Sequence, residues 1–415
     1  MALFFLAIAY LPIFLFQAIK TGKHYKGLME RLGYYSPATP AWLEKGRPIW
    51  IHAVSVGEVM AASTLVPLLK DRYPGLPLLI STVTETGNRV ARERIPDALV
   101  IFFPLDWRCI VERCLERFRP RLFLLIETEI WPNFLHACSK KDIPVAIING
   151  RLSRNSFRNY RLVRPFLRRV LAQISLFCVQ GEEDAQRFLE LGAPAERVRI
   201  TGNLKFDLQD KPGYGRESWE DWFPRGSSVL IAGSTHKGEE EAVLEAFLYV
   251  EKEFPNLCLL LAPRHPERLV EVEALLARRG IVYTKRTELP FKGMQGKVIL
   301  LDTVGELASL YGIGTLIFVG GSLVPRGGHN ILEPALFGKP ILFGPYMENF
   351  AEIASLFLSQ GAALQVRNEG ELADMVLALL RSPERAAALG KAAGDIMAAH
   401  RGAASRALEF IEEYL

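Results

Sequence analysis

The chain has 415 residues, of which 49% are hydrophobic and 23% are charged, and its formal net charge is +4. This length predicts two domains of roughly 150–200 residues each, and the composition excludes long disordered regions. The small net charge argues against nucleic-acid binding, which usually needs a larger and clustered basic excess. The five cysteines and seven histidines show no metal-ligand spacing, so we expect reduced thiols and no structural metal.

The first residues predict a membrane anchor. Residues 1–19 are almost all apolar, and Lys20, Lys23, Lys26 and Arg31 follow them. This length is near the lower limit for crossing a bilayer, which takes about 20 residues. Because the basic residues follow the apolar stretch, the positive-inside rule places the body of the chain in the cytoplasm. We expect the segment to span or lie in the membrane, and burial within the protein is the alternative.

From Pro48 onward, short apolar runs alternate with amphipathic stretches, which is typical of a parallel sheet with helices on both faces. A polar stretch at 208–227, rich in proline and glycine, predicts a linker. We therefore predict an α/β protein with doubly wound domains at 20–207 and 228–415 and a cleft between the carboxyl ends of their strands. The expected strands are Ile49–Val54, Leu76–Val83, Leu99–Phe103, Leu122–Ile126, Val145–Ile148, Leu176–Val179, Val229–Ala232, Leu257–Ala262, Val298–Leu301, Leu316–Val319, Ile341–Phe343 and Leu364–Val366. The expected helices include Val59–Lys70, Trp107–Arg117, Trp131–Lys140 and Ser156–Leu171.

Polar residues follow several expected strands of the first domain, where doubly wound sheets bind ligands. Glu58 is a candidate general base, or else a first-turn residue that the helix dipole keeps ionised and therefore only modestly basic. Glu127 and Glu129 come directly after a buried strand, where acids are costly unless they are paired or face the cleft. Glu129 as a helix cap and Glu127 as the partner of a cation are the structural alternatives. Lys205 either reaches into the cleft or is a solvated linker lysine.

The glycine-rich segment 327–334 is the most informative stretch of the second domain. It separates an expected strand from a short helix, so that backbone N–H groups beside the positive end of the helix dipole suit a phosphate. Asn330 and Glu333 are spaced to meet a sugar hydroxyl, although the same spacing is that of a capping box. Arg264 suits a phosphate or carboxylate, and the backbone of 304–306 either contacts a base edge or only starts a helix. Together these features predict a nucleotide site.

Taken in order, these motifs closely resemble those of the 3-deoxy-D-manno-oct-2-ulosonic acid (Kdo) transferases of lipopolysaccharide assembly. The resemblance extends over nearly the whole chain, and the ordered set is far more specific than any single motif. The matching segments are SVGE at 55–58, ETEIWPN at 127–133, NGRLS at 149–153, GNLKFD at 202–207, PRH at 263–265, GEL at 305–307, GGS at 320–322 and GGHNxxE at 327–333.

This resemblance implies the GT-B glycosyltransferase fold, in which two Rossmann-like domains face each other across a cleft. It implies inverting transfer of Kdo from CMP-Kdo to lipid IVA, the lipid A precursor, at the cytoplasmic face of the inner membrane, with no cofactor. Glu58 is then the proton acceptor, and Glu127 and Lys205 support the transition state, whereas Asn149 and Asn203 receive no role. The implied CMP-binding residues are Arg264, His265, Val304, Gly305, Glu306, Asn330, Ile331, Leu332 and Glu333.

Three other functions remain open on the sequence alone. The first is a GT-B enzyme that uses a UDP- or GDP-sugar, and the second is a sugar-nucleotide epimerase of the same architecture. The third is a membrane-tethered scaffold that binds sugar nucleotides or lipids without catalysis, which the acids and the lysine disfavour. The absence of a predicted metal site fits a CMP-sugar, because its leaving group is a single phosphate with less charge to neutralise than a diphosphate.

Overall fold

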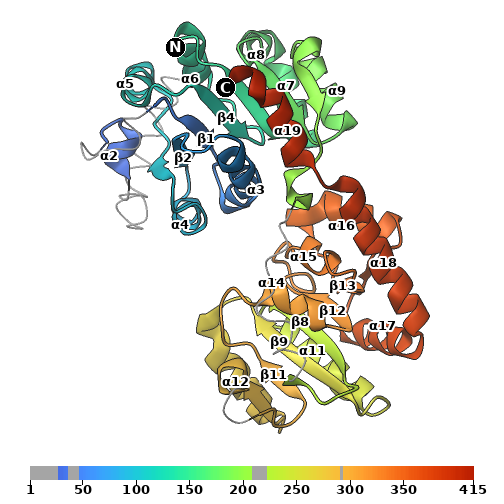
Figure 1. Cartoon of the computed structure of the whole chain (residues 1–415). Coiled ribbons are helices and arrows are strands. Elements are labelled where there is room, and N and C mark those ends of the chain that lie inside the picture. Colours follow the sequence, from blue (N-terminus) through green and yellow to red (C-terminus); the bar gives the residue numbers. More distant parts are fainter. Residues whose placement is uncertain (1–26, 36–45, 208–221, 290–292) are drawn as a thin grey trace. The chain divides into compact units, whose positions relative to one another are not determined.

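The computed structural model describes residues 27–35, 46–207, 222–289 and 293–415 (Figure 1). The chain divides into two compact units. Unit 1 comprises Met1–Asp207 together with Arg401–Leu415, and unit 2 comprises Leu208–His400. The predicted anchor at 1–19 and most of the predicted linker lie outside the described residues. Within the described ranges, no helix is both long enough and apolar enough to cross a bilayer.

Unit 1 is built on a seven-stranded parallel sheet with the strand order β3-β2-β1-β4-β5-β6-β7. Apolar side chains cover both faces: Trp50 belongs to one core, whereas Ile49 and Ile51 belong to the other. Strands buried on both faces are expected to form continuous apolar runs, as these do. The strands are β1 (Ile49–His52), β2 (Leu78–Thr82), β3 (Leu99–Phe102), β4 (Leu122–Ile126), β5 (Val145–Gly150), β6 (Leu176–Val179) and β7 (Val198–Ile200).

Helices connect these strands and cover the two faces of the sheet (Figure 1). The described unit 1 helices are α2 (Leu28–Arg31), α3 (Val56–Arg72), α4 (Glu85–Arg94), α5 (Arg108–Phe118), α6 (Pro132–Lys140), α7 (Arg154–Leu162), α8 (Arg164–Leu171), α9 (Glu182–Leu191) and α19 (Ala403–Ile411), with short 3₁₀ turns η1 (Ala195–Arg197), η2 (Leu204–Phe206) and η8 (Glu412–Tyr414).

Unit 2 repeats this plan with a second parallel sheet of seven strands in the order β10-β11-β9-β8-β12-β13-β14. Its strands are β8 (Ser228–Thr235), β9 (Leu257–Pro263), β10 (Tyr283–Lys285), β11 (Val298–Leu300), β12 (Leu316–Val319), β13 (Ile341–Phe343) and β14 (Leu364–Gln365). Its helices include α11 (Glu239–Glu251), α12 (Leu269–Arg278), α14 (Leu307–Leu310), α15 (Leu332–Ala335), α16 (Ala351–Ser359), α17 (Glu369–Arg381) and α18 (Pro383–His400).

The predicted α/β class is confirmed, and each expected strand is present to within a few residues. The single helix predicted at Ser156–Leu171 is wrong, because α7 ends at Leu162 and α8 starts at Arg164. Pro165 explains the break: a proline lacks the backbone N–H that a continuous helix needs, but it is well tolerated in the first turn of a new helix.

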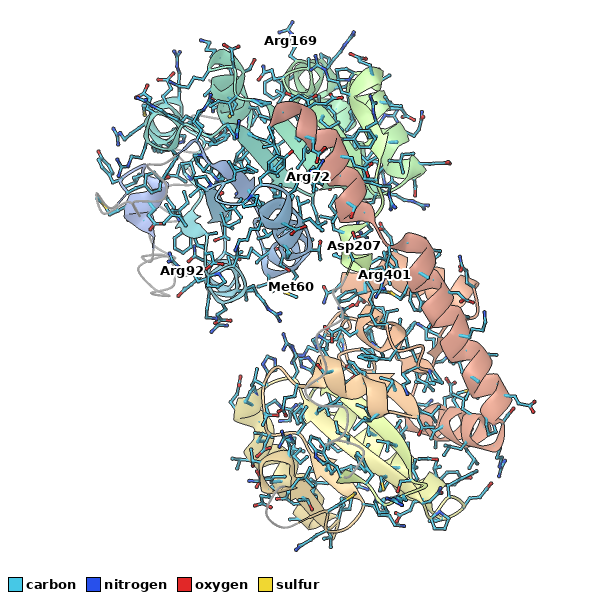
Figure 2. All side chains as sticks on the ribbon, viewed as in Figure 1. Met60, Arg72, Arg92, Arg169, Asp207 and Arg401 are labelled. Atoms are coloured by element: carbon cyan, nitrogen blue, oxygen red, sulfur yellow. The ribbon has the colours of Figure 1, made fainter. Side chains whose placement is uncertain are left out.

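The predicted second domain, 228–415, is wrong at its C-terminal end, because residues 401–415 belong to unit 1. Helix α19 buries Ala403, Ala407 and Ile411 in one core of unit 1. The Asp207 carboxylate accepts hydrogen bonds from the backbone N–H groups of Gly402 (2.6 Å) and Ala404 (2.5 Å), and so it caps the start of α19 (Figure 2). Helical periodicity shows that α19 has an apolar face, but it does not show which domain covers that face.

Candidate active site

The strand order of unit 1 reverses between β1 and β4, which are hydrogen-bonded neighbours. Such a reversal is the usual ligand site of a doubly wound sheet, because the chains leaving the two strands turn to opposite faces. Glu58 lies in the first turn of α3, directly after β1, and Glu127 follows the last residue of β4. Two of the predicted site residues therefore follow neighbouring strands at this reversal.

The Glu58 carboxyl group is buried and locally hydrogen-bonded. One oxygen accepts a bond from the backbone N–H of Val54 (2.7 Å), and the other accepts one from the Ser55 hydroxyl (3.0 Å). Although these two hydrogen bonds lower it, the pKa of Glu58 is raised to about 7, mainly by burial and additionally by the charges of Glu127 and Glu129. The expectation that the helix dipole would leave Glu58 a weak base is therefore wrong, because desolvation dominates. A carboxyl with a pKa near 7 is well suited to accept a proton at neutral pH.

Glu127 has an unusual backbone conformation, with φ = 61°, which lies in the left-handed region. Residues with a Cβ rarely adopt this conformation, and such strain is concentrated at functional sites. The neighbouring strand β5 shows the same feature at Asn149, where φ is also 61°. The Thr128 hydroxyl donates to the backbone carbonyl of Arg151 (2.6 Å), so the two strained strand ends are tied together.

Lys205 lies in the short turn η2, and its ammonium nitrogen is 3.7 Å from a carboxylate oxygen of Glu127. The Lys205 side chain is 22% exposed, and that of Glu127 is 25% exposed. The Lys205 side chain is therefore partly buried, whereas the structural alternative was a lysine in a linker with its side chain in solvent. Unit 1 therefore brings together all three predicted catalytic residues, since the charge of Glu127 also acts on Glu58.

Two asparagines without a role in the sequence analysis hold the Lys205 turn in place. The Asn149 side-chain oxygen accepts a bond from the backbone N–H of Leu204 (2.9 Å). The Asn203 side-chain oxygen accepts one from the backbone N–H of Lys205 (2.9 Å), and its amide donates to the side-chain oxygen of Gln180 (2.9 Å). The Asn203–Lys205 bond is a local cap of η2, but the bonds of Asn149 with Leu204 and of Asn203 with Gln180 join residues far apart in the chain, so no local sequence pattern reveals them.

The structure of the glycine-rich turn in unit 2 does not support the predicted phosphate site at the start of a helix. Helix α15 has only four residues, and so its dipole is too small to make the anion site that the sequence suggested. Gly327 and Gly328 have positive φ values of 83° and 72°, and a Cβ on either would collide with Asn349 or Met347. Close packing thus explains both glycines without a ligand.

The segment 330–333 contains two polar residues at its ends and two buried apolar residues between them. The Asn330 amide is 3.4 Å from a carboxylate oxygen of Glu333, and its own oxygen accepts from the backbone N–H of Leu332 (3.1 Å). Ile331 and Leu332 are fully buried. Of the four predicted CMP-binding residues in this segment, only Asn330 and Glu333 therefore have partly exposed side chains.

The other predicted nucleotide contacts follow β9 and β11. Arg264 and His265 are exposed at the end of β9, and Val304 is 80% exposed. Both oxygens of the Glu306 carboxylate lie 3.0 Å from the guanidinium of Arg286, in a bidentate pair. Because Arg286 already holds this carboxylate, we expect the segment 304–306 to contact a base through its backbone.

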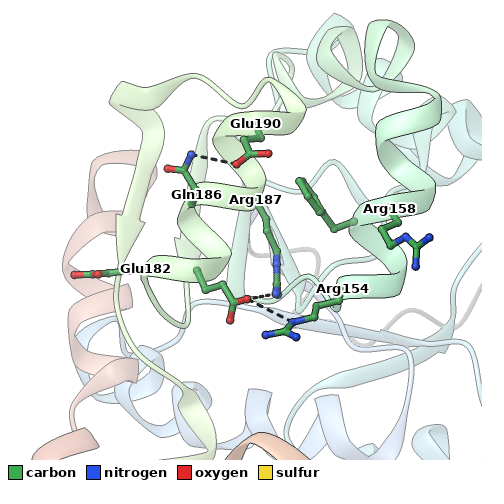
Figure 3. Close-up of a pocket in the computed structure, with 8 residues that line it drawn as sticks. Arg154, Arg158, Glu182, Gln186, Arg187 and Glu190 are labelled. Carbon is green, nitrogen blue, oxygen red and sulfur yellow. Dashed lines mark hydrogen bonds and ion pairs between the residues drawn. The ribbon is translucent and has the colours of Figure 1, made fainter.

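A hollow of unit 1 lies elsewhere, between α7 and α9 (Figure 3). It has a volume of about 650 Å³, and its charged side chains bind one another: Glu183 contacts both Arg187 and Arg154. It lies beside the helices rather than at the strand reversal, and we assign it no role in catalysis.

Comparisons with known proteins extend these observations. A family model described as "3-Deoxy-D-manno-octulosonic-acid transferase (kdotransferase)" matches residues 26–208. A 3-deoxy-D-manno-octulosonic acid transferase of Haemophilus influenzae is 37% identical over 404 residues, which cover 96% of this chain and 93% of the relative. A protein of the same description from Bordetella pertussis is 35% identical over 93% of this chain and 91% of its own length.

Among solved structures, a UDP-GlcNAc 2-epimerase from Neisseria meningitidis bound to UDP-GlcNAc aligns with 88% of this chain and 100% of its own, with a TM-score of 0.60. The sequence identity is 14%, so this likeness concerns the two-domain fold alone. The arrangement of two parallel-sheet domains is that of the GT-B fold.

Proposed function

The chain belongs to the family of 3-deoxy-D-manno-octulosonic acid (Kdo) transferases, and we propose that it transfers Kdo from CMP-Kdo to lipid IVA with inversion at the anomeric carbon. The observation that carries the proposed mechanism is Glu58, a buried carboxyl with a pKa of about 7 at the strand reversal of unit 1. A general base at such a point is what a single displacement by an acceptor hydroxyl requires.

In the proposed reaction, Glu58 takes the proton of the acceptor hydroxyl while the oxygen of that hydroxyl attacks the anomeric carbon. The bond from this carbon to the phosphate oxygen breaks, and CMP leaves with the electron pair. Attack on the face opposite the leaving group inverts the anomeric centre. The Lys205 ammonium, 3.7 Å from Glu127, stabilises the negative charge that develops.

Unit 2 is the proposed donor site, with Arg264 and His265 at the end of β9 and Asn330 and Glu333 after β12. The single phosphate and the Kdo carboxylate make the donor an anion, and the guanidinium of Arg264 suits such a ligand. Asn330 and Glu333 supply the amide and carboxylate groups that bind sugar hydroxyls.

The direct test incubates the purified full chain with CMP-Kdo and lipid IVA and follows the lipid by mass spectrometry. We expect the lipid to gain at least one Kdo, and CMP to inhibit the transfer far better than UDP. A lipid of unchanged mass would contradict the proposed reaction. Stronger inhibition by UDP would contradict the proposed donor and favour a UDP-sugar enzyme of the same fold.

We also propose that the chain acts at the cytoplasmic face of the inner membrane, where its acceptor resides. Besides the apolar segment 1–19, helices α7 and α8 support this location. Leu162, Val163 and Phe166 are 83%, 49% and 51% exposed around the junction of these helices. Exposed arginines surround them, including Arg169 (Figure 2). Apolar side chains ringed by cations bind anionic lipid surfaces.

This proposal predicts two additive effects on membrane binding. Deletion of residues 1–19 should release much of the protein from vesicles that contain anionic phospholipid. Adding Leu162→Asp and Phe166→Asp to the deletion should release most of the remainder in a flotation assay. Val270→Asp, at an apolar residue of unit 2 that is 76% exposed, is the matched control and should change nothing. Undiminished flotation of the combined variant would contradict a role for α7 and α8.

A further inference from the structure

Two histidines outside the predicted CMP site form a direct pair in unit 2. His236 follows β8 and His329 follows β12, and these two strands are neighbours at the point where the strand order reverses. Their Nε2 atoms are 2.9 Å apart, and the rings are parallel to within 3° with centroids 5.1 Å apart. This geometry means that the rings meet head to head, and one Nε2–H donates to the other Nε2.

The backbone around this pair is held in place. The buried carboxyl group of Glu239, in the first turn of α11, accepts hydrogen bonds from the backbone N–H groups of His236 (2.9 Å) and Gly321 (2.6 Å). The N–H of Gly328 in turn donates to the carbonyl of Gly321 (2.8 Å). A Cβ at Gly321 would lie only 2.9 Å from the His329 ring. Hydrogen bonds and close packing therefore hold the backbone that carries the two imidazoles.

The charged groups that face the two imidazoles are almost all basic. The side chains of Arg264 and His265 act on both rings from the end of β9, and those of Arg268 and Arg326 act on His236. The exceptions are two carboxyl groups. That of Glu239 accepts the backbone hydrogen bond from His236, and an oxygen of the Glu240 carboxylate lies 2.7 Å from a guanidinium nitrogen of Arg268.

Burial and these cations lower the pKa of both His236 and His329 to about 4. The pair is therefore uncharged at neutral pH, although it lies within a positive field. An anion is the ligand that relieves such a field, because it offsets the repulsion between the surrounding cations.

We propose that His236 and His329 form the phosphate subsite of the donor site: a phosphate oxygen replaces the accepting nitrogen, so that both imidazoles donate to the anion. This inference rests on the proposed function and deepens it. His329 precedes Asn330, the residue proposed for the sugar hydroxyls of the nucleoside, and a phosphate lies one ester bond from the ribose. Arg264, exposed at the end of β9, completes the set of donors around the anion.

The test compares CMP with cytidine, which lacks the phosphate, on the full-length protein. Binding of both ligands is measured by calorimetry or by ligand-observed NMR, with cytidine at up to millimolar concentration. His236→Gln and His329→Gln are each expected to weaken CMP binding by about tenfold to a hundredfold, as expected for hydrogen bonds to a charged group. Cytidine should bind these variants as it binds the wild type. His400→Gln removes an imidazole elsewhere in unit 2 and should change neither affinity.

A second readout is specific to the imidazoles. A bound phosphate raises the pKa of an adjacent histidine, so the affinity of the wild type for CMP should increase relative to that of His329→Gln as the pH falls from 8 to 6.5. The titration of CMP itself cancels in this ratio. Unchanged CMP affinity in both variants, or equal losses for CMP and cytidine, would overturn the subsite. If the wild type bound no CMP at all, the proposed function would fail instead.

Discussion

Replacing Glu58 by glutamine is expected to lower kcat for Kdo transfer by roughly 10²–10⁴-fold, the usual loss when a general base is removed. Glutamine keeps an oxygen that can accept from Val54 N–H, so the local fold should persist. It cannot accept the proton of the acceptor hydroxyl. The affinity for CMP, measured by calorimetry, is the control and should not change, since the proposed CMP residues all lie in unit 2. Near-normal turnover by Glu58→Gln would eliminate this residue as the base.

The pH dependence of kcat/KM provides an independent test of the same assignment. Glu58 must be ionised to accept a proton, so activity should rise with pH and level off above about 7. Glu129→Gln removes a negative charge that raises the pKa of Glu58, and it should move the rise to lower pH. Ser55→Ala removes a hydrogen bond that lowers this pKa, and it should move the rise to higher pH. If neither variant moved the profile, some other group would control it.

The fold was largely predictable because its central strands are buried on both faces. Residues such as Leu124 and Ile317 lie within continuous apolar runs, which identify a strand without any knowledge of its neighbours. Strands β7 and β10 have three residues each and lie at sheet edges, where Ile200 is 50% exposed, and the sequence analysis missed both. The position of α19 was missed for a different reason: Asp207 and Gly402 are bonded across 195 positions of the chain.

The sequence predicts candidate site residues but not their electrostatics. Glu58, Glu127 and Arg264 were identified because each follows a strand, and parallel strands end at the same edge of their sheet. The pKa of Glu58 depends on burial and on two other carboxylates, none of which can be evaluated before the chain folds. The contacts of Asn149 with Leu204 and of His236 with His329 join distant segments and leave no periodic signal.

Lys205→Met is expected to reduce kcat by roughly 10²–10³-fold, because it removes the positive charge proposed to stabilise the transition state while keeping the approximate length of the side chain. The affinity for CMP should again stay unchanged. Glu127→Gln alone should reduce kcat by a smaller factor, because Lys205 is still present although it is no longer oriented by a charged partner. Because Glu127 and Lys205 are 3.7 Å apart, their effects should not add in a double-mutant cycle. Strict additivity would show that the two residues act separately.

Glu127→Gly separates a catalytic role of this side chain from a structural one. At φ = 61° the wild-type residue has a backbone conformation that costs a non-glycine residue about 1–2 kcal/mol, whereas glycine adopts it freely. The variant should therefore melt at a temperature no lower than that of the wild type and yet lose activity. If Glu127 served mainly to stabilise unit 1 through its ion pair with Lys205, the melting temperature would fall together with the activity. If Glu127 is strained and does not stabilise the protein, a role of its side chain in the reaction explains why this residue is present. Strain of this kind persists where function requires the side chain.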